Sequence, residues 1–302
     1  DAAPADPYDR VLAGRFGRTE DLRRQLTRIQ LSGRLANLIY SLDTTATDFY
    51  AHQFKPVLSF LESPCNGLLI ADEVGLGKTI EAGLIWTELR ARLDARRLLV
   101  VCPAMLREKW RDELRRRFGI RAELVGAGEL LAALREPKDT WPAERALVGS
   151  LQGLRPSGDW QSTDEQGERA QLARLLDEQA DAEPLFDLVV IDEAHYLRNP
   201  QSLSAELGRL LREVSAHLVL LSATPVNTRA DDLFELLRLV DPENFRYGEQ
   251  FQQVLLANRP LLRARACALD LRASLAQVVD ELRKAQAHPL LAGSRQLQDL
   301  IA

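Results

Sequence analysis

The stretch "ADEVGLGKT", residues 71–79, has the residue types of a phosphate-binding loop. Gly75 and Gly77 allow the backbone to curl so that its N–H groups point at phosphate oxygens, and a helix that follows adds a favourable dipole. Lys78 would reach the β- and γ-phosphates of a nucleotide, and the hydroxyl of Thr79 would ligate Mg²⁺. The stretch therefore predicts a nucleotide site.

A second polar cluster ends the apolar run in "DLVVIDEAH", residues 187–195. Open α/β sheets bind ligands at the carboxyl ends of their strands, so carboxylates at such an end belong beside a phosphate loop. Asp192 would hold Mg²⁺, usually through water, and Glu193 would orient and deprotonate an attacking water. Either residue could instead cap the next helix, but a cap does not explain why the pair accompanies the loop.

A third cluster lies in "LVLLSATPVNT", residues 218–228, after another apolar run. The hydroxyl groups of Ser222 and Thr224 could sense the γ-phosphate or form a hydrogen bond with His195. The alternative is a helix cap ahead of "ADDLFELLRLV". Because the other two motifs are present, we favour a coupling role for these residues.

The elements that would carry these groups are short apolar runs separated by longer helical patterns. Because the runs are continuous and not alternating, they predict strands buried on both faces, as in a parallel sheet covered by helices. The strand candidates are residues 67–71, 98–102, 122–125, 146–150, 187–191 and 217–222, and the helix candidates are residues 79–94, 105–118, 168–180 and 202–213. The pattern predicts an α/β fold with a doubly wound parallel sheet.

Three segments are expected along the chain. They are an N-terminal extension at residues 1–45 with a helix at residues 19–40, an α/β domain at residues 46–245 with an acidic surface insertion near residues 156–184, and a helical extension at residues 246–302. In the last segment, Asn258 followed by Pro260 predicts the start of a helix.

The composition is that of an ordinary globular protein, with 46% hydrophobic and 27% charged residues among 302. No apolar run approaches the ~20 residues of a membrane span, which predicts no membrane partner. The first residues lack the pattern of a secretory signal. The three cysteines have neither disulfide nor zinc-ligand spacing, which predicts a reducing, cytoplasmic location.

The charge pattern leaves two interpretations open. A net charge of −5 argues mildly against an indiscriminate nucleic-acid binder. Residues 107–121, "REKWRDELRRRFGIR", are nevertheless strongly basic. This stretch could steer a polyanion, or it could be the solvated face of a helix.

In this order and spacing, "DEVGLGKT", "DEAH" and "SATP" resemble motifs I, II and III of superfamily-two helicases and translocases. The stretches "IEAG", "RNP" and "LFELLRLVDPENF" resemble, more narrowly, the Swi/Snf family and its bacterial branch, which includes an RNA-polymerase recycling factor. The resemblance covers roughly residues 48–245. This family begins the loop with Asp-Glu-x-Gly, so Asp72 and Glu73 are expected in the nucleotide site although the general loop pattern has a glycine at the position of Asp72.

The resemblance also implies a RecA-like lobe with ATP and Mg²⁺ as cofactors, and it assigns further site residues. In "FYAHQFKPVLSFL", Gln53 would read adenine. In "LLVVCPAMLREKWRDEL", Pro103, Arg107 and Trp110 would lie near nucleic acid, although a tryptophan on an amphipathic helix is more often part of the core. In "LVGSLQGLR", Ser150 would face DNA at the end of a strand.

The activity implied by the resemblance is ATP-driven translocation on double-stranded DNA and remodelling of bound protein. The family also has a second RecA-like lobe with a Q-x-x-G-R-x-x-R type motif, and nothing after residue 245 resembles it. We therefore expect lobe one alone, with weak ATPase activity. RNA polymerase or defence-system subunits are the expected protein partners. The alternatives are another superfamily-two helicase, or an ATP-gated docking subunit that uses the helices of residues 247–302.

Overall fold

The computed structural model describes residues 50–63, 65–72, 75–136, 144–180, 182–223, 230–270 and 274–301. The chain divides into two compact units, with the boundary between residues 227 and 228. The expected N-terminal extension, with its helix at residues 19–40, lies outside the described residues, and the expected domain boundary at residue 245 stays a prediction. In the part of the chain that is described, none of the helices has both the length and the apolar character needed to cross a bilayer.

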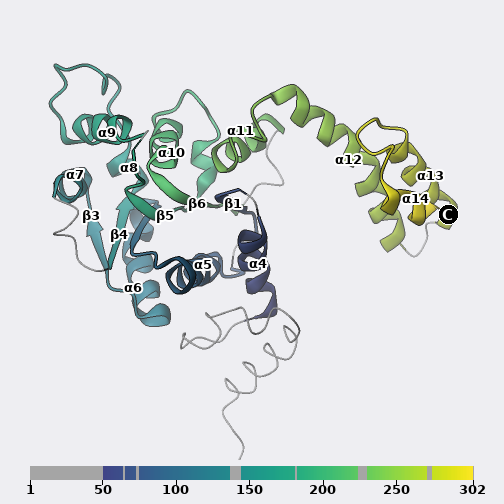
Figure 1. The fold of residues 1–302 in the computed structure, drawn as a ribbon, viewed down its shortest axis with the longest axis horizontal. Helices are drawn as coiled ribbons and strands as arrows, with labels where there is room; N and C mark the ends of the chain where they lie inside the picture. The colour runs from purple at the N-terminus through teal and green to yellow at the C-terminus, as the bar shows by residue number, and fades with distance from the viewer. Residues whose placement is uncertain are drawn as a thin grey trace, which may run out of the picture. The chain divides into compact units, whose positions relative to one another are not determined.

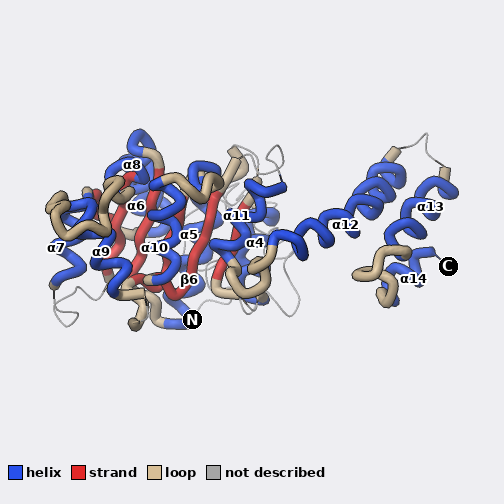
Figure 2. The backbone as a smooth tube through the Cα atoms, turned by 90° about the horizontal axis from the view of Figure 1, so that it is seen from above, coloured by secondary structure: helices blue, strands red, loops and turns tan. Residues whose placement is uncertain are grey.

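The first unit is built on a six-stranded sheet in which all neighbouring strands run parallel. The strands are β1 (Gly67–Ile70), β2 (Arg97–Cys102), β3 (Ala122–Val125), β4 (Arg145–Ser150), β5 (Phe186–Ile191) and β6 (Ser215–Leu221). Their order across the sheet is β1-β6-β5-β2-β4-β3. The predicted parallel α/β fold is confirmed, and Figures 1 and 2 show the strands side by side between helices.

Helices connect the strands as expected for parallel pairing, which requires a crossover between consecutive strands. The helical elements of this unit are η2 (Ala51–Gln53), α4 (Phe54–Glu62), α5 (Lys78–Leu93), η3 (Ala104–Leu106), α6 (Arg107–Phe118), α7 (Ala127–Arg135), α8 (Leu151–Leu154), α9 (Glu168–Glu178), η5 (Ala194–Leu197) and α10 (Leu203–Glu213). The four helices predicted from the sequence are present, whereas α4 and α7 were not predicted.

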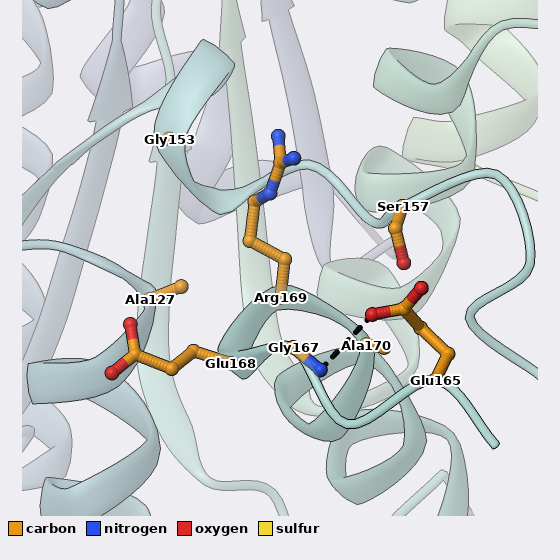
Figure 3. A pocket seen from close by; sticks show the side chains of 8 residues that line it. All are labelled: Ala127, Gly153, Ser157, Glu165, Gly167, Glu168, Arg169 and Ala170. Atoms are coloured by element: carbon orange, nitrogen blue, oxygen red, sulfur yellow. Dashed lines mark hydrogen bonds between the residues drawn. The ribbon is translucent and has the colours of Figure 1, made fainter. Parts of the chain in front are cut away.

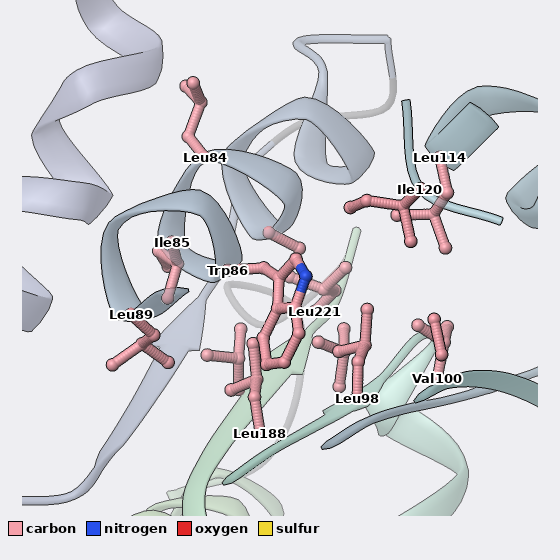
Figure 4. Packing of buried hydrophobic residues seen from close by; sticks show 14 of the residues in the cluster. Leu84, Ile85, Trp86, Leu89, Leu98, Val100, Leu114, Ile120, Leu188 and Leu221 are labelled. Atoms are coloured by element: carbon pink, nitrogen blue, oxygen red, sulfur yellow. The ribbon is translucent and has the colours of Figure 1, made fainter. Parts of the chain in front are cut away.

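Both faces of the sheet are buried. On one face, Leu98, Val100 and Leu188 pack in a core with residues of α4, α5 and α6, which includes Trp86 (Figure 4). The alternate strand residues point to the other face, and Leu99 there is equally buried because α8 and α10 contact the sheet. Two covered faces explain why the strand sequences are continuously apolar.

The described residues of the second unit form the helices α11 (Ala230–Val240), α12 (Gly248–Leu269), α13 (Leu275–Gln286) and α14 (Arg295–Ile301), of which the last three lie in the segment expected to be a helical extension. Phe251 of α12 packs against Phe234 and Phe245, with ring centroids 5.6 and 5.9 Å apart. The predicted helix start at Asn258 and Pro260 is wrong, because Pro260 lies inside α12. A proline there removes one backbone hydrogen bond, which the packing of α12 against α13 offsets.

Candidate nucleotide site

The predicted phosphate loop joins β1 to the first residue of α5, at the carboxyl edge of the sheet. Gly75 and Gly77 have φ values of +93° and +99°, in the region that favours glycine. A Cβ atom on Gly77 would lie 2.4 Å from Nε2 of Gln53, so any other residue there would also require that side chain to move. The two glycines therefore have the conformational role that the motif predicted.

The side chain of Gln53 forms a hydrogen bond with the backbone of this loop. Its side chain is 3% exposed, and its Nε2 donates to the carbonyl oxygen of Leu76 at 3.1 Å. Its Oε1 accepts from the backbone N–H of Tyr50 at 3.1 Å. The structure thus brings Gln53 to the loop as expected, and its reading of adenine stays a prediction.

Lys78 and Thr79 occupy the first turn of α5. The Nζ atom of Lys78 donates to the backbone carbonyl oxygen of Asp72 at 2.8 Å, which ties the start of α5 to the end of β1. Both side chains are half-buried. Glu73, which was predicted to belong to the same site, lies outside the described residues. The lysine ammonium and the threonine hydroxyl are therefore adjacent at the point where the loop meets the helix.

Sequence reasoning missed Glu81, which is fully buried in the first turn of α5. Neither carboxylate oxygen has a hydrogen-bond partner meeting normal geometry in the described part of the chain. The pKa of Glu81 is raised to about 8, chiefly by burial and then by the neighbouring carboxyl of Asp72, while Lys78 opposes the change. An acid inside the apolar run "TIEAGLI" was the sequence signal that could have identified it.

Asp192 directly follows β5, and its backbone N–H donates to the carbonyl oxygen of Val101 at 2.8 Å. The side chain is 9% exposed, and both of its oxygens accept hydrogen bonds. Oδ2 accepts from the indole Nε1 of Trp110 at 2.9 Å, and Oδ1 accepts from the backbone N–H of Glu193 at 2.8 Å. The predicted metal-holding carboxylate is therefore held by two donors.

Glu193 has a φ of +53°, which is uncommon for a residue other than glycine. Its side chain makes no cap for η5, which removes the evidence for the alternative interpretation of a helix cap at this residue. His195 Nδ1 lies 3.0 Å from Oε2 of Glu193, and its ring stacks at a tilt on Tyr196 with centroids 4.4 Å apart. The 3.0 Å approach does not have the geometry of a hydrogen bond, so the backbone turn is what places Glu193 at the strand end.

Ser222 follows β6 and lies beside the end of β1, because its backbone N–H donates to the carbonyl oxygen of Ile70 at 3.0 Å. The residue is 1% exposed, and its hydroxyl has no partner among the described residues. The hydrogen bond with His195 that the sequence suggested is therefore not formed. Thr224 lies outside the described residues.

The residues predicted to contact DNA have mixed positions. Pro103 and Arg107 are half-buried at the start of η3 and α6. The hydroxyl of Ser150 is used within the protein, since it accepts from the backbone N–H of Gly153 at 3.0 Å and caps α8. Trp110 is 2% exposed and donates to Asp192, which agrees with the alternative that this tryptophan is part of the core, and its position near nucleic acid stays a prediction.

A hollow of about 400 Å³ opens next to the phosphate loop, between α4 and β1. Its lining residues are His52, Lys55, Pro56, Ser59, Leu68, Leu69, Ile70, Ala71, Asp72 and Leu76. The volume falls within the range of small-molecule sites, and the lining combines apolar and polar groups as such sites do. The hollow therefore offers space for a nucleotide's organic portion beside the predicted phosphate position.

A second hollow, of about 290 Å³, lies near the start of α9 (Figure 3). Arg169, Glu165 and Glu168 are among its lining residues, and the Glu165 carboxylate accepts from the backbone N–H of Gly167 at 3.0 Å. Because side chains of both charge signs line it, this hollow indicates no particular ligand.

Comparisons with known sequences agree on one family. A sequence profile of the SNF2-related domain matches residues 35–288. The RNA polymerase-associated protein RapA of Stutzerimonas stutzeri (strain A1501) is 32% identical over 269 residues, covering 87% of this chain and 26% of that protein. RapA of Yersinia pseudotuberculosis serotype O:1b (strain IP 31758) is 29% identical over 259 residues, covering 84% of this chain and 25% of that protein. The chain thus spans about a quarter of the length of these relatives.

Two solved structures also align with the chain. The Sulfolobus solfataricus SWI2/SNF2 ATPase core in complex with double-stranded DNA has a TM-score of 0.49 and 18% identity, covering 80% of this chain and 43% of that one. The ATPase core domain of the same organism has a TM-score of 0.48 and 17% identity, covering 83% and 46% of the two chains.

Proposed function

Because the chain belongs to the SNF2-related domain family, we propose that its α/β unit binds and hydrolyses ATP as the first lobe of a two-lobed DNA translocase. One observation carries this proposal. The sheet order puts β1, β6 and β5 side by side, so the phosphate loop, Ser222 and the carboxylates of Asp192 and Glu193 meet at one edge. Parallel strands present their carboxyl ends at the same edge, where α/β sheets bind ligands.

The residues at this edge fit a Mg-nucleotide. The loop around Gly75 and Gly77 has the left-handed backbone that points N–H groups at phosphates, and Lys78 supplies a cation beside it. The hydroxyl of Thr79 and the carboxylate of Asp192 are oxygen donors, which Mg²⁺ prefers. When bound, the metal would neutralise phosphate charge during transfer.

Within this proposal, Glu193 holds the attacking water and accepts its proton, and the His195 ring lies 3.0 Å from the carboxylate. Lys78 binds the phosphates, and Ser222 offers a buried hydroxyl between the phosphate loop and the carboxylates of Asp192 and Glu193. The charge that develops on the transferred phosphoryl group calls for an additional arginine, which is worth ~10³–10⁵ in rate in related sites. We propose that a second lobe supplies it, so the chain alone hydrolyses ATP slowly.

The partners proposed for the complete protein are double-stranded DNA and RNA polymerase. The curated relatives are named for association with RNA polymerase. The predicted DNA-facing residue Arg107 begins α6, whose last turn carries Arg115, Arg116 and Arg117. A cytoplasmic location follows from the same proposal.

The first test is nucleotide binding by the variant Lys78→Ala, measured by calorimetry with Mg-ATP on the chain of 302 residues. We expect at least a tenfold loss of affinity, equivalent to ~1.4 kcal/mol, because Lys78 is the only lysine in the loop and its ammonium group is removed. Folding should be unchanged, since Lys78 bonds a loop carbonyl and is not part of the core. The control is Lys284→Ala, which removes an exposed lysine paired with Asp280 in the second unit. Equal affinities for parent and Lys78→Ala would refute the site.

A further inference from the structure

We propose that Trp110 is a positioning residue for the metal-binding carboxylate: its indole N–H fixes Asp192 in the orientation that holds the metal of a bound nucleotide. This inference rests on the proposed function and adds a residue from a different helix to the site. The interaction joins residues 82 positions apart in the sequence, from α6 to the end of β5.

The geometry of the hydrogen bond restricts the Asp192 carboxylate. The distance from Nε1 of Trp110 to Oδ2 of Asp192 is 2.9 Å, and both side chains are buried. A bond from a neutral donor to a carboxylate is stronger than one between neutral groups, and low dielectric strengthens it further. An indole can only donate, so its orientation is set once the ring is packed. The bond therefore allows Asp192 little freedom of rotation.

Asp192 has no other side-chain hydrogen-bond partner among the described residues. Its other oxygen, Oδ1, accepts from the backbone N–H of Glu193, which is the next residue in the chain. Of the two donors to the carboxylate, only Trp110 comes from another element of the fold. Trp110 belongs to α6, which packs against α5 and against β3 and β4. It is thus the group that ties the carboxylate to the rigid core.

The bond lies in a poorly solvated environment. Trp110 is 2% exposed and Asp192 is 9% exposed, so a hydrogen bond lost between them is not replaced by bulk water. Groups that orient metal ligands typically change metal affinity by 10–100-fold when they are removed.

The test compares Trp110→Phe with Trp86→Phe. Phenylalanine keeps an aromatic ring in the core and removes only the N–H donor and part of the ring. Trp86 is a matched control because it is also 2% exposed and lies in the same apolar core (Figure 4), and no described residue accepts a hydrogen bond from its indole. A loss of packing should affect both variants, whereas a loss of carboxylate orientation should affect only Trp110→Phe.

The main measurement is the Mg²⁺ concentration at which a fluorescent ATP analogue reaches half of its maximal binding. We expect this concentration to rise 10–100-fold in Trp110→Phe and less than twofold in Trp86→Phe. Binding of the analogue in excess chelator should be the same in parent and both variants, because it depends on the loop and Lys78. An unchanged Mg²⁺ dependence in folded Trp110→Phe would overturn the inference.

A second measurement examines the bond itself and does not depend on nucleotide. The chain has four tryptophans, so an amide-correlation NMR spectrum of the ¹⁵N-labelled protein contains four indole signals. In Asp192→Ala, one of them should move upfield, because the Trp110 N–H loses its charged acceptor. If no indole signal moves, the positioning bond does not exist in solution. If the signal moves but the parent binds no nucleotide, the contact stands and the proposed function fails.

Discussion

The raised pKa of Glu81 predicts that the free energy of unfolding depends on pH. Its pKa is raised from 4.5 to about 8, chiefly by burial and then by the carboxyl of Asp72. Between these two pH values the folded chain binds a proton that the unfolded chain has already released. Unfolding therefore releases a proton in this window, and the free energy of unfolding falls as the pH rises. The contribution is fully present below pH 4.5 and is lost above about pH 8.

The size of the effect follows from the two pKa values. At 1.36 kcal/mol for each pH unit, the difference amounts to ~5 kcal/mol between the acidic and alkaline limits. This is a large part of the ~5–15 kcal/mol that stabilises a typical domain. Glu81→Gln keeps the shape of the side chain and cannot ionise. The variant should match the parent within ~1 kcal/mol near pH 5 and exceed it by ~3–5 kcal/mol near pH 9.

The assay is urea unfolding followed by tryptophan fluorescence at several pH values from 5 to 9. Glu88→Gln is the matched control, because Glu88 is fully buried in the same helix but is ion-paired with Arg92 at 2.9 Å. The variant Glu88→Gln should have a lower free energy of unfolding than the parent at every pH, and this free energy should change with pH as steeply as it does in the parent. A slope in Glu81→Gln as steep as in the parent would show that another group binds the proton.

Substitutions at two further positions test the backbone and the amino edge of the sheet. Asp94 ends α5 with a φ of +54°, so Asp94→Gly should raise the unfolding free energy by ~0.5–1 kcal/mol in thermal melts, whereas Asp94→Ala should not. Asp187 is half-buried, and this partial burial by itself raises its pKa, but hydrogen bonds from Arg97 and from the amides of Arg96 and Arg97 hold the pKa below its usual range. The ionised Asp187 therefore stabilises the fold above pH 3.8, and this stabilisation is lost as the pH falls further. The variant Asp187→Asn should have a lower free energy of unfolding than the parent at pH 7. In acid titrations followed by circular dichroism, its stability should decline less steeply than that of the parent.

The strands were predictable because each is an uninterrupted apolar run, and those at residues 98–102 and 187–191 differ from β2 and β5 by one residue at the start. Their order in the sheet was not predictable from the residue pattern, since parallel pairing depends on contacts across long stretches of chain. The helix start predicted at Pro260 was wrong because a proline after a polar residue is common at a helix start, and tertiary packing tolerates it inside α12.

The site was predictable where its residues are consecutive in the sequence. Lys78, Asp192 and Glu193 carry their signal in short motifs, and the structure places all three at the expected edge of the sheet. The bond from Trp110 to Asp192 joins distant segments, and no local pattern distinguishes a buried indole with an acceptor from one without. Glu81 did have a local signal, namely an acid among apolar neighbours, but its meaning depends on the burial that only the fold shows.

The position of β1 has a consequence for biosynthesis. Within the described residues β1 pairs only with β6, and Gly67 is in register with Leu218. A ribosome adding ~5–20 residues per second needs ~8–30 s to make the roughly 150 residues between them. During this interval the strand that precedes the phosphate loop has no partner, and an unpaired strand edge can associate with other chains. A nascent chain halted before Ser215 would therefore contain the whole loop sequence and still lack the sheet position that makes it a binding site.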